Sequence, residues 1–453
     1  MFSAHAFVFL SLCLWGAMPI FSQNVNRLNN SLLNEIQSRA AQEYPSLDQL
    51  YKQLHANPEL SFHEAKTAER IAIELEKAGF TVTRNVGGYG VVGVLKNGSG
   101  PTVLVRTDLD ALPIVENTGL EYASRVRVKD DQGSEVGVMH ACGHDVHMTS
   151  LVGAARVLSQ MKDKWRGTLV FIGQPAEERG GGATAMLADG LFTKFPKPDF
   201  CLAWHVAADV PAGSAGYCEG YALANVSSVD LTVRGVGGHG AYPHTTKDPI
   251  VIASQIVLAL QTIVSREIKP IDAAVVTVGS IHGGTKHNII PDEVHLQITV
   301  RSYLDAVHEQ TIKSIERISK GIAQAAGVAE DRMPIMKVAD DYTPSTYNDP
   351  ALVKRLTKSM QTILGAEKVV QREPVMGGED FGRYGRTEEK IPIAMFWLGT
   401  VAQERVQQSR RDGVQLPSLH SSLFAPLPEP SIKTGVTAMA AAVLDLLAGK
   451  KGL

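Results

Sequence analysis

Residues 168–173 read Thr-Leu-Val-Phe-Ile-Gly, and residues 174–178 follow as Gln-Pro-Ala-Glu-Glu. An apolar run of this length, closed by Gly and Pro, is typical of a strand buried on both faces of a parallel sheet. Two glutamates at the end of such a strand are costly to bury without a metal or a polar partner. The stretch therefore predicts a buried sheet with a polar site at its edge. Similar runs occur at 102–106, 200–203 and 391–398.

Helical patterns lie between these runs. Residues 61–64, Ser-Phe-His-Glu, have the spacing of a capping box, and the helix expected over 65–78 would end at Gly79. A second helix with apolar periodicity is expected over 148–161. Alternating strands and helices predict an α/β fold in which helices cover both faces of an open, largely parallel sheet, that is, an α/β/α sandwich.

The middle of the chain has a different pattern. Two helices and four strands are expected there in the order β-α-β-β-α-β, which is the ferredoxin-like arrangement. We therefore predict an inserted α+β domain within the larger α/β unit. The predicted division is a signal peptide at 1–23, a first catalytic part at 24–215, the inserted domain at 216–333 and a second catalytic part at 334–453.

The N-terminus indicates export. Residues 1–26 contain no Lys, Arg, Asp or Glu, and 6–21 are almost wholly apolar. Such a run is short for a membrane span, which needs about 20 apolar residues, and is typical of a signal peptide. We expect a periplasmic or secreted protein with no stable membrane span after processing. A retained N-terminal anchor is the alternative.

Composition excludes some classes of function. The 453 residues carry a net charge of -3, with 44% hydrophobic and 20% charged residues. This balance suits a large globular core and gives no basic surface for nucleic acid. Three cysteines remain after removal of the leader, an odd number that does not suggest a disulfide framework.

Four separate stretches carry metal-ligand types of side chain. Besides Glu177 and Glu178, they contribute Met-His-Ala-Cys-Gly-His-Asp at 139–145, Trp-His at 204–205 and Leu-His-Ser at 419–421. Thiolate, imidazole and carboxylate groups together suit zinc or a similar divalent ion. Each stretch alone is weak, because a lone His at a strand end is more often a hydrogen-bonded structural residue.

The order of these motifs resembles the N-acyl-amino-acid amidohydrolase branch of the aminoacylase and glutamate-carboxypeptidase metallopeptidases, which includes hippurate hydrolase and plant auxin-conjugate hydrolases. The resemblance covers nearly all of the chain after the leader and implies a zinc-peptidase-like fold. It is carried by the stretches RTDLDALP (106–113), HACGHDVH (140–147), QPAEE (174–178), WH (204–205), GGHGAYPH (237–244), NIIP (288–291), GGEDF (377–381) and LHS (419–421).

The resemblance implies two divalent metal ions, zinc in the first instance, with manganese, cobalt or nickel as alternatives. Glu177 would be the general base that deprotonates an activated water. Asp110, or less favourably Asp108, would orient a ligand histidine. We expect His140 and His147 to form structural hydrogen bonds. The implied metal ligands are Cys142, His144, Glu178, His205 and His420.

The resemblance also implies that the inserted domain forms a homodimer and covers the site as a lid. His239 would reach the neighbouring subunit's site and stabilise the oxyanion, and Asn288 would contact the substrate. Without the resemblance, His239 would be interpreted as a turn residue in a Gly-rich loop. The expected activity is hydrolysis of the amide bond of N-acyl amino acids. The alternatives are a metallo-carboxypeptidase or dipeptidase acting on short peptides, and a non-catalytic binding protein on the same scaffold.

Overall fold

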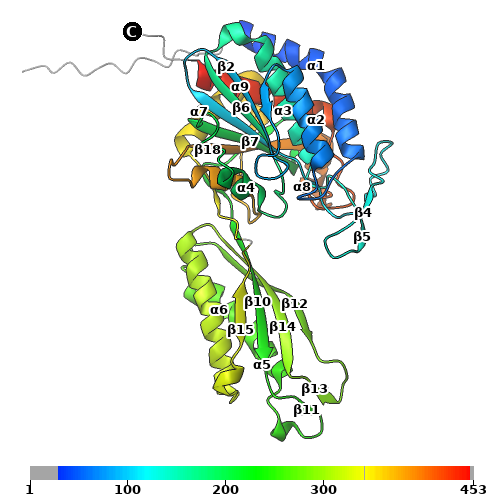
Figure 1. Cartoon of the computed structure of the whole chain (residues 1–453), viewed down its shortest axis with the longest axis vertical. Helices are drawn as coiled ribbons and strands as arrows, with labels where there is room; N and C mark the ends of the chain where they lie inside the picture. The colour runs from blue at the N-terminus through cyan, green and yellow to red at the C-terminus, as the bar shows by residue number, and fades with distance from the viewer. Residues whose placement is uncertain (1–28, 341, 449–453) are drawn as a thin grey trace, which may run out of the picture.

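The computed structural model describes residues 29–340 and 342–448, so the predicted signal peptide at 1–23 lies outside the described residues. Figure 1 shows two lobes. The larger lobe is built on an eight-stranded sheet in the order β1-β2-β6-β3-β7-β18-β8-β17. Its strands are β1 (Thr81–Thr83), β2 (Val91–Asn97), β3 (Thr102–Asp108), β6 (Gly167–Gln174), β7 (Phe200–Pro211), β8 (Ala215–Tyr217), β17 (Val369–Gln371) and β18 (Ile393–Val401).

The four apolar runs of the sequence form the centre of this sheet. Strands β6, β3, β7 and β18 are neighbours and run parallel, as predicted. The sheet as a whole is mixed, because β1 and β2 on one side and β8 on the other add antiparallel pairs. The central strands are almost wholly buried, which explains why their sequences do not alternate between apolar and polar residues.

Helices cover both faces of the sheet unequally (Figure 1). On one face, a large apolar core joins the sheet to α1 (Asn30–Ala56), α2 (Ala65–Lys77), α3 (His144–Gln160), α7 (Pro350–Leu364) and α9 (Pro428–Leu447). The other face packs against the short helix α4 (Gly182–Ala188) and the 3-10 segment Asp380–Gly385. A further helix, α8 (Gln403–Asp412), precedes the loop that carries His420.

Helices α3 and α9 approach closely because glycine faces a side chain at two points. A Cβ on Gly153 would lie 2.3 Å from Val436, and one on Gly435 would lie 2.4 Å from Ser150. Helix α9 is apolar on all sides and mostly buried, so it is a core helix although it is long and apolar enough to span a membrane. This packing fixes α3, whose first residue is His144.

The capping box predicted at 61–64 is wrong. Helix α2 begins at Ala65, and the side chain that caps its first turn is Glu59, whose Oε2 accepts the backbone N–H groups of Lys66 and Thr67. Ser61 instead donates from Oγ to Oδ2 of Asp110 over 2.6 Å. Glu64 is fully buried and accepts the backbone N–H of Ala176, which has a left-handed φ of 48°. Both side chains therefore stabilise loops at the edge of the sheet, because long-range partners compete for the groups that would form a local cap.

The inserted lobe has its own sheet and core. Its strands β10 (Asn225–Arg234), β12 (Ala274–Gly283), β14 (Glu293–Ser302) and β15 (Ile335–Val338) form an antiparallel sheet in the order β12-β14-β10-β15. With α5 (Pro249–Thr262) and α6 (Asp305–Ala325), they give the β-α-β-β-α-β order predicted from the sequence. At the end remote from the larger lobe, β11 (Gly238–His239) pairs with β13 (Ile289–Ile290) (Figure 1).

The boundaries of the inserted lobe differ from 216–333. Strand β8 belongs to the eight-stranded sheet. Strand β9 (Gly220–Leu223) pairs with β16 (Thr346–Asn348) outside both the eight-stranded and the four-stranded sheet. The small sheet begins at Asn225 and ends at Val338. The prediction missed these strands because they are only three or four residues long and carry no strong apolar pattern. A separate hairpin is formed by β4 (Arg127–Lys129) and β5 (Glu135–Gly137).

Candidate metal centre

The candidate ligands meet where the central parallel strands end. Glu177 and Glu178 lie just after β6, and His144 is the first residue of α3. His205 lies within β7 rather than at its end, because the strand continues to Pro211. His420 comes from the loop between α8 and α9. Residues separated by up to 278 positions thus reach one edge of the sheet, as expected for ligand sites of open α/β sheets.

The structure brings together all five residues implied as metal ligands. Sγ of Cys142 lies 3.6 Å from Nε2 of His205. Glu178 approaches Nε2 of His144 at 3.7 Å and Nε2 of His420 at 3.5 Å. The ligand atoms of Cys142, His144 and His205 lie within 4.8 Å of one another, and so do those of Cys142, Glu178 and His420. Cys142 belongs to both groups, which is the arrangement of two metal positions sharing one thiolate.

The tautomers of two histidines suit metal binding. Nδ1 of His144 lies 2.8 Å from the carbonyl of Asp110, and Nδ1 of His205 lies 2.9 Å from the carbonyl of Val206. A carbonyl only accepts, so each Nδ1 carries a proton, and Nε2 is the ring nitrogen left to bind a metal in the neutral imidazole. Nε2 of His144 and Oε1 of Glu178 are buried without a hydrogen-bond partner in the described residues. This donor set fits divalent ions.

Electrostatics also favour a cation here. Burial opposes the charged form of His144, but Asp108, Asp110 and Glu178 raise its pKa to about 10. Burial, with Asp110 and Asp108 nearby, raises the pKa of Glu178 to about 7 against the opposing effect of His144. Burial and the surrounding carboxylates also raise the pKa of the Cys142 thiol. The raised pKa values of Glu178 and Cys142 show that acidic groups are crowded together here, and bound divalent cations would favour their deprotonated forms.

Asp110 and Asp108 have different partners. Oδ2 of Asp110 accepts from Ser61 and from the backbone N–H of Glu178, and its Oδ1 lies 3.5 Å from Nδ1 of His144. Asp108 accepts from Nδ1 of His147 over 2.7 Å. Asp110 therefore contacts two candidate ligands, whereas Asp108 orients His147, which is not among them, and approaches Nε2 of His144 at 3.7 Å.

The two remaining histidines of the cluster differ. His147 donates from Nδ1 to Asp108 and accepts the backbone N–H of Val206 at Nε2, so its structural hydrogen bonds are present. The same prediction for His140 is wrong, because neither of its ring nitrogens has a hydrogen-bond partner among the described residues. Burial lowers the pKa of both rings to about 4, which keeps them neutral.

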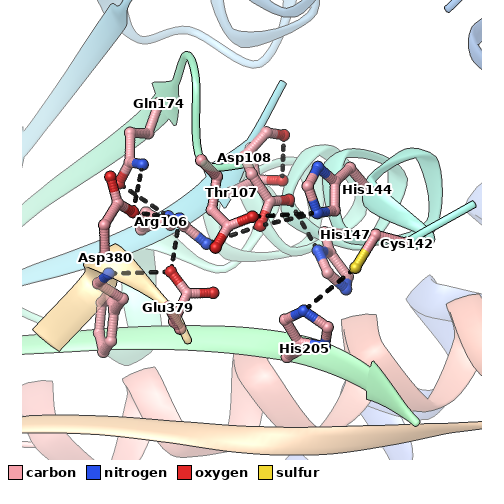
Figure 2. Close-up of polar contacts among 12 residues, drawn as sticks. Arg106, Thr107, Asp108, Cys142, His144, His147, Gln174, His205, Glu379 and Asp380 are labelled. Carbon is pink, nitrogen blue, oxygen red and sulfur yellow. Dashed lines mark hydrogen bonds and ion pairs between the residues drawn. The ribbon is translucent and has the colours of Figure 1, made fainter. Parts of the chain in front are cut away.

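A buried polar network behind the ligands was not assigned from the sequence (Figure 2). Arg106 donates to Gln174, Asp108, Glu379 and Asp380 over 2.7–3.1 Å. The motifs at 106–113 and 377–381 carry these residues, but their spacing gives no sign that they meet. The available signal was an arginine at the end of an otherwise apolar strand, which requires buried acidic partners.

The cluster opens into a cavity of about 1040 Å³. Cys142, Glu177 and Glu379 line it from the larger lobe, and Val226 and Arg301 line it from the inserted lobe. The Nη1 group of Arg301 donates to the carbonyl of Met376 over 2.7 Å. The cavity therefore combines metal-ligand groups, acidic groups and a cationic side chain from the inserted lobe.

His239 and Asn288 do not join this cluster within one chain. Both lie at the exposed tip of the inserted lobe, where β11 pairs with β13 (Figure 1). The backbone N–H of Gly240 donates to the carbonyl of Asn288, and Nδ1 of His239 accepts the backbone N–H of Ala241. The imidazole Nε2 thus remains available at the surface.

This fold, with a buried cluster of Cys, His and Glu ligands beside a second glutamate, defines a metal-dependent hydrolase with a site for two divalent ions. The chain belongs to the peptidase family M20/M25/M40, whose sequence profile matches residues 104–412.

Relatives and a solved structure agree with this membership. The chain is 36% identical over 396 residues to thermostable carboxypeptidase 1 of Saccharolobus solfataricus, covering 86% of this chain and 93% of that protein. It is 39% identical over 340 residues to hippurate hydrolase of Campylobacter jejuni, covering 74% and 84%. The crystal structure of Bacillus subtilis YxeP, described as a dinuclear metal-binding peptidase of the M20 family, matches with a TM-score of 0.71 at 29% identity and covers 91% and 99%.

Proposed function

We propose that the protein hydrolyses the amide bond of N-acyl amino acids and releases a carboxylic acid and an amino acid. The observation that carries the proposal is the cavity, which is lined both by Arg301 and by the cluster that contains Glu177. A guanidinium at this place suits the carboxylate of an N-acyl amino acid. Leu223 and Val375 add an apolar wall for an acyl group. Similar proteins are named hippurate hydrolase, IAA-amino acid hydrolase and N-acetylcysteine deacetylase.

In this proposal two divalent ions, with zinc as the proposed metal, are held by the five ligands named above. When bound, such ions lower the pKa of a water and polarise the scissile carbonyl. Glu177 lies 3.8 Å from Nε2 of His144 and accepts the proton of the water. Burial, together with Glu379, Glu178 and Asp380, raises the pKa of Glu177, which helps it to carry this proton to the leaving nitrogen.

The inserted lobe is proposed to form a homodimer. Helix α5 is apolar yet exposes Val251 and Leu258, and the edge strand β12 exposes Ile281. An apolar helix beside an unpaired strand edge is a surface that a second copy would cover. A dimer would also give His239 and Asn288 a site to act on, since they lie far from the cluster of their own chain.

Hydrolysis of a panel of N-acetyl and N-benzoyl amino acids and of dipeptides, with and without chelator, tests the proposal. Chelator-sensitive release from the acylated compounds supports it. Cleavage of peptides alone would favour the carboxypeptidase or dipeptidase alternative, which the carboxypeptidase relatives keep open. Absence of all cleavage with metal bound would favour a binding protein.

Export is proposed as well, on the apolar run of residues 6–21. N-terminal sequencing of the mature protein is the test. Processing near residue 23 supports export, and an intact N-terminus on protein in the cytoplasmic fraction would contradict it.

A further inference from the structure

Three carboxylates share the single guanidinium of Arg106, and only one of them retains an unused oxygen. Asp108 accepts from His147 at Oδ1 and from Arg106 at Oδ2. Asp380 accepts from Arg106 and Gln174 at Oδ1 and from the backbone N–H of Ala183 at Oδ2. Glu379 accepts the hydrogen bond from Arg106 at Oε1. Its Oε2 has no hydrogen-bond partner among the described residues.

Glu379, the residue that carries this free oxygen, forms part of the cavity wall. The residue is 1% exposed and lines the cavity together with Glu177 and His205. One oxygen each of Glu379, Glu177 and Asp380 lie within 4.8 Å of one another. In Figure 2, Glu379 points one oxygen toward Arg106 and the other away from it. A buried carboxylate oxygen without a donor is costly, so a donor on a bound molecule would be favourable.

Oε1 of Glu379 is fixed by two donors. Besides Arg106 at 2.8 Å, the backbone N–H of Phe381 donates to it over 2.9 Å. The carboxylate therefore cannot turn to present Oε1 to the cavity without breaking both bonds. Oε2 is therefore left as a preorganised acceptor, on a residue whose carboxylate lies close to the proposed general base.

We propose that Oε2 of Glu379 accepts the N–H of the scissile amide and, after cleavage, an N–H of the released amine, so that this residue selects amides over esters. This inference rests on the proposed hydrolysis of N-acyl amino acids. Glu379 is then a catalytic residue that touches the leaving group, in addition to the groups that activate water.

The chemistry of the leaving group explains why an acceptor belongs here. Water adds its oxygen to the carbonyl carbon, the C–N bond breaks, and the nitrogen keeps the electron pair of that bond. The proton that Glu177 took from the water goes to this nitrogen, which leaves as an amine. A secondary amide has one N–H before this step and the amine has two afterwards. An ester oxygen has none and would face the carboxylate with its lone pairs.

Glu379→Gln is the informative variant. Arg106 and Phe381 still require an acceptor at the Oε1 position, so the glutamine oxygen is held there and its NH2 group occupies the position of Oε2. The change replaces an acceptor with a donor at nearly constant volume. Asp380→Asn is the matched control, because it disturbs the same Arg106 network without changing the free oxygen.

The experiment compares, in wild type and both variants, kcat/KM for the best N-acyl amino acid of the panel and for its oxygen ester, for example N-benzoylglycine and O-benzoylglycolate. We expect Glu379→Gln to lower the amide-to-ester ratio by about tenfold to a hundredfold, as for a hydrogen bond to a charged group. Asp380→Asn should lower both rates by a similar factor. Metal content and melting temperature are measured for each protein.

An unchanged ratio in Glu379→Gln, with both rates reduced equally, would overturn the role of Glu379 and leave it a positioning residue. Loss of metal from Glu379→Gln alone would also overturn it, because the oxygen would then serve the metal site. If wild type hydrolyses no amide, the proposed function itself fails.

Discussion

The backbone N–H of Glu178 donates to Oδ2 of Asp110 over 3.0 Å. The carbonyl of the same aspartate accepts Nδ1 of His144 over 2.8 Å. One residue thus holds two candidate ligands that lie 34 positions apart, and Ser61 holds the carboxylate in turn. Since neighbours behind the ligands set their orientation, Asp110 should affect metal affinity without contacting metal.

Asp110→Ala should lower metal affinity by about 10–100-fold, because the backbone N–H of Glu178 loses its acceptor and His144 loses the carboxylate oxygen 3.5 Å from its Nδ1. Metal titration of apo-protein measures this. Asp48→Ala, which removes contacts with Lys52 and Tyr44 within helix α1, is the control. Equal affinities in the two variants would show that Asp110 does not support the site.

Glu177→Gln should lower kcat by about 10²–10⁴, because glutamine cannot take a proton from water, while metal content stays near the wild-type value. Kinetics and elemental analysis on the same sample measure both. Loss of metal from this variant would mean that Glu177 and Glu178 exchange roles.

Cys142→Ala should reduce the bound metal, because Cys142 lies in both groups of ligand atoms. Cys201→Ala is the matched control, since Cys201 is also fully buried but lies in the apolar core. Elemental analysis after dialysis gives the stoichiometry. Full activity and metal content in Cys142→Ala would contradict the two-metal assignment.

His239→Ala should lose turnover without unfolding, and Glu177→Gln subunits should restore it in trans. In a mixed dimer, the subunit with intact Glu177 receives His239 from its partner. Random co-assembly of the two inactive chains should therefore give about a quarter of wild-type activity. Mixtures as inactive as each variant alone would place His239 outside the partner's site.

The two buried ion pairs of His55 should make the stability of the protein depend on pH. Burial opposes its charge, but Asp145 at 2.7 Å and Glu116 at 3.0 Å raise the pKa of His55 to about 9. The pKa of His55 is higher in the folded protein than in the unfolded chain. Charged His55 therefore contributes fully to the free energy of unfolding below about pH 6.5, and this contribution is lost as the pH rises through 9. Its size is about 3 kcal/mol.

Denaturant unfolding of metal-free wild type and His55→Gln at about pH 6.5 and pH 9.5 measures this contribution. The difference in unfolding free energy between the two proteins should shrink at the higher pH. A difference that does not change with pH would show that His55 is neutral in the folded protein.

Several features followed from sequence alone because their causes are local. The runs at 102–106 and 168–173 predicted buried parallel strands, since a strand covered on both faces has no polar side to show. The inserted β-α-β-β-α-β order was likewise visible from periodicity. The ligand residues could be proposed because metal binding restricts their chemistry, and the motif resemblance supplied their order.

Tertiary structure alone decided what these residues contact. Ser61 and Glu64 had the spacing of a helix cap, yet they bind Asp110 and Ala176, because the fold brings these long-range partners next to them. The free oxygen of Glu379 exists only because Arg106 and Phe381 occupy the other one. Sequence thus determined which segments are buried and which carry metal-binding chemistry, since both depend on local side-chain properties. Hydrogen-bond partners were decided by the fold, because chain topology brings distant groups together.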